Sequence, residues 1–208
     1  MNRFRAGLIW IALAAAIIIP LVLAASSPLL AWRQPVYIVA GFAGVLAMGL
    51  LLVQPLLAGG YLPGISAFNS KRIHRAIGIL LVAAVIIHVF TLWLTSPPDV
   101  IDALTFTSPT PFSAWGVVAM WTVFAAALFV ALRKRLQIRP RIWRLGHTAL
   151  ALITIVGSVV HALLIEGTME PVSKIVLCIL VVAATLKVLF DLRVWVIRKR
   201  VGGRTTPG

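Results

Sequence analysis

Four histidines, His74, His88, His147 and His161, are the residues whose type and spacing point most directly to chemistry. They form two pairs, and thirteen residues separate the members of each pair. Fourteen steps of about 100° end about 40° short of four full turns, so both members of a pair lie on one face of an α-helix, about 21 Å apart along its axis. Ionisable side chains inside apolar helices usually have a function, so both pairs are candidate metal ligands.

The elements that must position these histidines are long apolar segments. Of the 208 residues 61% are apolar, whereas a soluble domain has about 45–50%. Six segments have the roughly 20 residues that an α-helix needs to cross a bilayer. They span residues 7–25, 36–57, 73–94, 114–132, 145–165 and 175–196. We therefore expect an all-α fold, a six-helix transmembrane bundle that forms a single domain over residues 1–208.

The charged residues indicate how the bundle is oriented. The formal net charge is +14, and the basic residues cluster near both termini and in the second and fourth links between segments. The other three links hold four of the five acidic residues and only two basic ones. Because basic loops favour the cytoplasmic side, we expect both termini to be cytoplasmic. Membrane lipid with anionic head groups accounts for the charge, so we expect no nucleic-acid partner.

The sequence outside the histidine segments supports three smaller predictions. The first segment, with Arg3 and Arg5 before it, resembles a signal peptide, but its apolar run is longer than a usual signal core, so we expect it to be retained as a helix. The link 95–112 begins with two prolines and has helical apolar spacing, which predicts a short helix on the outer surface. Lys187 and Asp191 are spaced to form a salt bridge along the sixth segment.

The third and fifth segments run in the same direction, because one crossing separates them. His74 is therefore at the depth of His147, and His88 at the depth of His161. Two neutral imidazoles that approach one point from opposite sides are the axial arrangement of a low-spin haem iron. Zinc fits less well, since it normally takes four ligands and no cysteine or acid is placed to complete either set. The pattern predicts two stacked bis-histidine haem sites.

Arginines and glycines near the histidines have two readings each. Arg75 and Arg144 lie close to the inner histidines and could pair with haem propionates, although the orientation rule alone explains their positions. Gly78 and Gly157 lie four residues from a histidine on the histidine face. They would either let a macrocycle approach the helix backbone or serve as small-residue contacts between helices.

Six crossings with two His-x13-His helices, the third and fifth, resemble the ferric reductase-like transmembrane domain shared by ferric reductases and NADPH oxidases. The most similar part is RIWRLGHTALALITIVGSVVHALL, residues 141–164. The resemblance implies two b-type haems, an inner one held by His74 and His147 and an outer one held by His88 and His161. It also implies that electrons pass outward from a flavin and nicotinamide domain, which these 208 residues do not contain.

The size and number of crossings resemble the haem-binding membrane subunit of bacterial methionine sulfoxide reductase systems. This likeness implies a di-haem b cytochrome in the bacterial inner membrane, supplied by a cytoplasmic flavin/NAD(P)H reductase. The acceptor at the outer face would be ferric iron or a periplasmic reductase such as a methionine sulfoxide reductase. Bound flavin is left open. Two alternatives remain: a quinol-oxidising cytochrome b anchor subunit, and a haem-free transporter or assembly protein.

Overall fold

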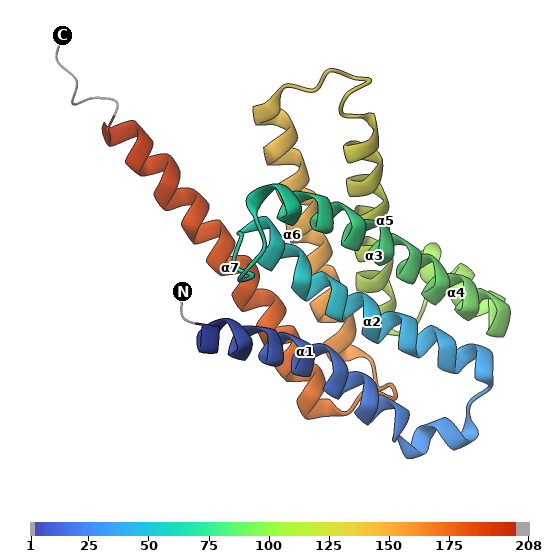
Figure 1. Cartoon of the computed structure of the whole chain (residues 1–208). Coiled ribbons are helices and arrows are strands. Elements are labelled where there is room, and N and C mark those ends of the chain that lie inside the picture. The colour runs from blue at the N-terminus through green and yellow to red at the C-terminus, as the bar shows by residue number, and fades with distance from the viewer. Residues whose placement is uncertain (1–2, 203–208) are drawn as a thin grey trace, which may run out of the picture.

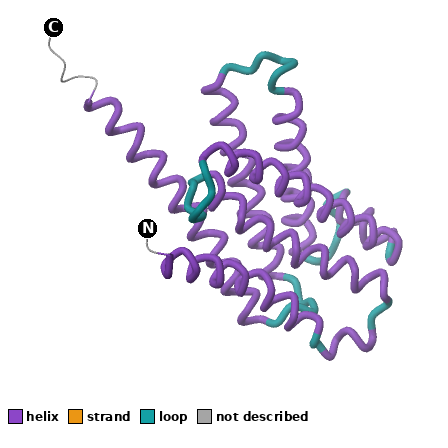
Figure 2. The backbone as a smooth tube through the Cα atoms, viewed as in Figure 1, coloured by secondary structure: helices purple, strands orange, loops and turns teal. Residues whose placement is uncertain are grey.

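Helices make up almost all of the described chain (Figure 2). The computed structural model describes residues 3–202, and side chains as far as Asp191. Within that range the helices are α1 (Arg3–Ala25), the 3-10 helix η1 (Pro28–Trp32), α2 (Pro35–Ala58), α3 (Ala67–Thr95), α4 (Pro97–Leu104), α5 (Pro111–Leu132), α6 (Pro140–Leu164) and α7 (Pro171–Gly202). Six of these described helices, α1, α2, α3, α5, α6 and α7, are long and apolar enough to cross a membrane.

These six helices confirm the predicted all-α membrane bundle, and α4 is the short helix predicted in the link 95–112. The protein is therefore a multi-pass membrane protein. With an even number of spans, the start of α1 and the end of α7 lie on the same side of the bundle, and the last part of α7 projects beyond the other helices (Figure 1). That this side is cytoplasmic remains a prediction.

Most helices begin at a residue type that suits a helix N-terminus. Six of the eight described helices, η1 included, start at a proline, which has no N–H to leave unsatisfied in the first turn. α3 instead follows Ser66, whose hydroxyl accepts a hydrogen bond from the Asn69 N–H at 3.3 Å. Before α7, the Glu170 carboxylate accepts hydrogen bonds from the N–H groups of Ser173 and Val172, and these bonds lower the Glu170 pKa.

The helices pack as two close pairs with a third layer against them. α3 packs along α2, and α6 packs along α5, whereas α3 and α6 are not a closely packed pair. α7 lies against α2 and α6, and α1 covers the outside of α2 and α7 (Figure 1). The main buried cluster lies between α2 and α7 and includes Leu52, Leu177 and Val181. Since α3 and α6 belong to different pairs, the space between them is left for their side chains.

The link between α2 and α3 is bound to α7 by side-chain contacts at the basic end of the bundle. The Tyr61 hydroxyl donates a hydrogen bond to the Asp191 carboxylate, and Lys187 Nζ lies 2.8 Å from the same carboxylate, which confirms the predicted salt bridge. Lys187 also lies 5.0 Å from the centre of the Tyr61 ring. Gly59 leaves room for that ring, because a Cβ at Gly59 would lie 2.3 Å from Tyr61 Cε2. Burial and the neighbouring Asp191 carboxylate raise the pKa of Tyr61 to about 12.

The hydrogen bond from Tyr61 to Asp191 predicts that Tyr61→Phe changes thermal stability in a pH-dependent way. An unfolded tyrosine ionises near its ordinary pKa of 10.0, whereas folded Tyr61 holds its proton to about 12. Stabilisation by the hydroxyl is therefore complete below pH 10 and is lost as the pH rises toward 12. In thermal unfolding followed by circular dichroism, wild type should exceed Tyr61→Phe in midpoint temperature at pH 9, and the difference should shrink at pH 11. An advantage that grows with pH would contradict this, and Tyr37→Phe is the control for removing the other phenol hydroxyl.

Candidate functional site

The four histidines lie in two pairs between α3 and α6. His74 and His147 have ring centroids 6.3 Å apart, and His88 and His161 have centroids 6.4 Å apart. The ring planes are inclined by 76° in the first pair and by 82° in the second. Two imidazoles that bind one metal ion from opposite sides, at metal–nitrogen distances of about 2.0 Å, have centroids roughly 6 Å apart. Each pair therefore has the spacing at which a single ion fits between the rings.

Hydrogen bonds to neighbouring helices fix three of the four rings. His88 Nδ1 lies 2.7 Å from the carbonyl oxygen of Ala40, and His161 Nδ1 lies 2.8 Å from that of Phe112. His74 Nδ1 lies 3.2 Å from the carbonyl of Gln54. A carbonyl can only accept, so Nδ1 donates its proton in each bond and the lone pair is left on Nε2. This is the tautomer in which a histidine coordinates a metal through Nε2.

Two glycines let the rings of His88 and His161 lie directly against the neighbouring helices. A Cβ at Gly44 of α2 would lie 3.2 Å from His88 Nδ1, and one at Gly116 of α5 would lie 2.7 Å from His161 Nδ1. Sequence reasoning missed both residues. A signal was present, because each glycine lies in an apolar segment next to a histidine segment. Each also follows by four positions the residue whose carbonyl bonds the ring, Ala40 or Phe112.

Gly78 and Gly157 have a different role from these two. A Cβ at Gly78 would lie 3.3 Å from Gln54 Nε2, and one at Gly157 would lie 3.0 Å from the Trp115 carbonyl oxygen. The neighbours of both glycines are therefore atoms of α2 and α5. Of the two readings that the sequence left open, the structure supports contact between helices.

His147 is held differently from the other three histidines. Its ring lies parallel to that of Trp143, with centroids 5.4 Å apart and planes inclined by 5°. The Arg133 guanidinium lies over the Trp143 ring, 4.2 Å from its centre. His147 Nδ1 and Trp143 Nε1 are both buried without a hydrogen-bond partner among the described residues. Stacking takes the place of a carbonyl bond at this histidine.

The two candidate arginines lie at the basic end of the site. Arg75 follows His74 directly on α3, and Arg144 lies three residues before His147 on α6. Both side chains are exposed. Neither forms an ion pair or a side-chain hydrogen bond within the part of the chain that the structure describes. Their guanidinium groups are therefore free to pair with an anionic group near that end.

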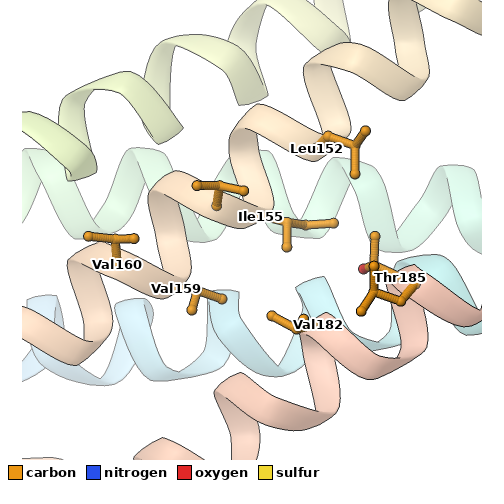
Figure 3. Close-up of a pocket in the computed structure, with 8 residues that line it drawn as sticks. Leu152, Ile155, Val159, Val160, Val182 and Thr185 are labelled. Atoms are coloured by element: carbon orange, nitrogen blue, oxygen red, sulfur yellow. The ribbon is translucent and has the colours of Figure 1, made fainter. Parts of the chain in front are cut away.

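The donor set and its surroundings suit haem better than a metal ion held by protein ligands alone. Among the described residues, no three His, Cys, Asp or Glu side chains come together as a metal site. Apolar cavities adjoin both histidine helices. One, of about 190 Å³, lies between α6 and α7 and is lined by side chains that include Ile155, Val159 and Val182 (Figure 3). Another, of about 270 Å³, lies among α3, α4 and α5 and includes Val89 and Met120. Neither is lined by a histidine, so they lie beside the histidine pairs. The helices that carry the histidines are themselves mostly apolar, and a flat apolar macrocycle gains from burial among such side chains.

The family comparison agrees with this geometry. Residues 43–158 match the family described as ferric reductase like transmembrane component. The match extends from α2 into α6 and includes His74, His88 and His147. Comparisons with curated proteins and with solved structures found no match. Since the family match covers more than half of the 208 residues, the chain belongs to the ferric reductase-like transmembrane family.

Proposed function

We propose that the protein is a di-haem b membrane cytochrome, with one haem held by His74 and His147 and the other by His88 and His161. The observation that carries this proposal is the pair of centroid distances, 6.3 and 6.4 Å, between helices that belong to different packed pairs. Membership of a ferric reductase-like family supports a function in membrane electron transfer.

The residues around each pair suit electron relay better than substrate binding. Haem, when bound, supplies one-electron redox chemistry. With a histidine on each side of the iron no coordination position is open, so substrate would not bind at the metal. The carbonyls of Ala40 and Phe112 orient the rings of His88 and His161 and raise their basicity. Arg75 and Arg144, exposed near the other pair, would bind its propionates through charge-assisted hydrogen bonds.

We further propose that electrons enter at the basic end, which faces the cytoplasm of a bacterium, and leave at the acidic end. The link between α5 and α6 is rich in arginine and lysine, whereas Asp99, Asp102, Glu166 and Glu170 lie in or beside links at the opposite end. The distribution supports a position in the inner membrane. A cytoplasmic flavin/NAD(P)H reductase would be the donor, and ferric iron or a periplasmic reductase, such as a methionine sulfoxide reductase, the acceptor.

Haem content and its EPR spectrum test the bis-histidine assignment. Protein purified from cells with an intact haem supply should show a reduced b-type absorption spectrum with two haems per chain. The ring planes are inclined by 76° and 82°. If both rings of a pair held an iron at this inclination, two of its d orbitals would be almost equal in energy. The ferric protein should therefore give strongly anisotropic low-spin EPR signals, unlike the rhombic signal of coplanar rings. A colourless preparation would contradict the proposal and favour a haem-free transporter or assembly protein.

Gly116→Ala tests whether the His161 ring lies in a binding position. The new Cβ would lie 2.7 Å from His161 Nδ1, so the ring must move. We expect one haem per chain to be lost while the haem at His74 and His147 is retained. The measurement is the haem to protein ratio.

Gly41→Ala is the matched control for Gly116→Ala. Its Cβ would lie 3.5 Å from Thr168 Oγ1, which is an ordinary contact, and it is expected to keep both haems. Full haem content and an unchanged spectrum in Gly116→Ala would count against the assignment of His161.

The electron donor can be tested in vesicles with the basic end outward. A flavin reductase with NAD(P)H, added outside, should produce the reduced spectrum, and the rate should fall as salt screens the basic link. Reduction by a water-insoluble quinol analogue, without reduction by the flavin reductase, would instead identify a quinol-oxidising anchor subunit.

A further inference from the structure

The two histidine pairs differ in the hydrogen bonds made by Nδ1. At one level, His88 and His161 both have a carbonyl oxygen within 2.8 Å of Nδ1. At the other level, His74 Nδ1 is 3.2 Å from its carbonyl, and His147 Nδ1 is buried without a partner among the described residues. This difference separates one histidine pair from the other. It does not separate α3 from α6, because each of these helices contributes one histidine to each pair.

A cation contacts the tryptophan that stacks on the less hydrogen-bonded pair. Arg133 lies where α5 ends, and its guanidinium is 4.2 Å from the centre of a Trp143 ring. Trp143 lies four residues before His147 on α6, and the two rings are parallel, 5.4 Å apart. Close packing of α5 on α6 sets this arrangement, because Gly146 leaves room for Phe129, which a Cβ would approach to 3.0 Å.

Both differences, in hydrogen bonding and in the nearby cation, would favour the ferrous state of an iron held by His74 and His147. A hydrogen bond from Nδ1 to a carbonyl raises the basicity of the imidazole, which stabilises the ferric state more than the ferrous state. His88 and His161 donate a short hydrogen bond from Nδ1 to a carbonyl, whereas His147 Nδ1 has no such bond among the described residues. The Arg133 guanidinium would oppose the additional positive charge of ferric iron, and because Arg133 is half-buried this interaction is less screened than that of a fully exposed cation. The His74 and His147 level therefore favours the ferrous state.

We propose that the site of His74 and His147 has the higher midpoint potential of the two, and that Arg133 and Trp143 are the positioning residues that raise it. This inference rests on the proposed function, because it requires haem at both levels. Trp143 holds the His147 imidazole plane by stacking, and its ring also contacts the Arg133 guanidinium.

Redox titration of the purified protein, followed by absorption, tests the inference. Wild type should titrate in two waves. In Arg133→Gln the higher midpoint potential should fall while the lower one stays in place, and Arg133→Lys should restore most of the shift. Lys134→Gln is the matched control, since it removes an exposed cation from the adjacent position and should leave both waves close to wild type.

The titration tests the role of Arg133, and haem content tests the proposed function independently. Two haems per chain establish the cytochrome before any titration begins. An equal shift in Arg133→Gln and Lys134→Gln, a shift of the lower wave alone, or no shift would overturn the role of Arg133. If Arg133→Gln loses haem, Trp143→Leu and Trp143→Phe decide instead. Loss of the stacked ring in Trp143→Leu should lower the higher wave, and Trp143→Phe, which keeps a ring, should lower it less. Identical waves in these two variants would also overturn the inference.

Discussion

The packing of α3 on α2 and of α6 on α5, which leaves α3 and α6 apart, is the constraint on which the rest of the structure depends. If α3 and α6 packed directly, their backbones would approach and the imidazoles would have no room to face each other. Instead each histidine helix is held from behind, and three histidines bond carbonyls of α2 or α5. A lipid environment supplies no water to satisfy a buried ring nitrogen, so these bonds settle both the tautomer and the orientation of the ring. The same helix packing therefore sets the distance between the rings and, for His74, His88 and His161, the nitrogen that the ring offers.

The sequence was sufficient to predict the spans and which histidines lie side by side, because both depend on properties that add up along the chain. Apolar length predicts a membrane helix without knowledge of its neighbours, and a spacing of fourteen positions returns two histidines to one helix face. The prolines that begin α2, α5, α6 and α7 are likewise local signals. The 61% apolar composition is explained by the lipid-facing surface, on which residues such as Ile79 and Leu128 are exposed.

The surroundings of the histidines could not be predicted in the same way. The partners of His88 and His161 are backbone carbonyls, which every residue possesses, so Ala40 and Phe112 have no distinguishing side chain. Gly44 resembles any small residue of a membrane helix until the position of the His88 ring is known. Trp143 resembles an aromatic anchor near the membrane surface, and only the fold shows that its ring lies parallel to His147. Each of these features depends on the rotation of one helix against another, which periodicity within a single helix does not specify.

The basic end of the bundle shows that orientation and chemistry can use the same residue. A count of cations in the link between α5 and α6 explains Arg133 by the preference of basic loops for one side of the membrane. The structure places the same guanidinium over Trp143, one ring away from His147. The two explanations do not compete, because the loop preference fixes only the side of the membrane and packing against an aromatic ring fixes the position. An arginine suits both requirements, since its charge is permanent and its planar guanidinium stacks on an indole. The charge that orients the helices is thus also available to act on the nearest histidine.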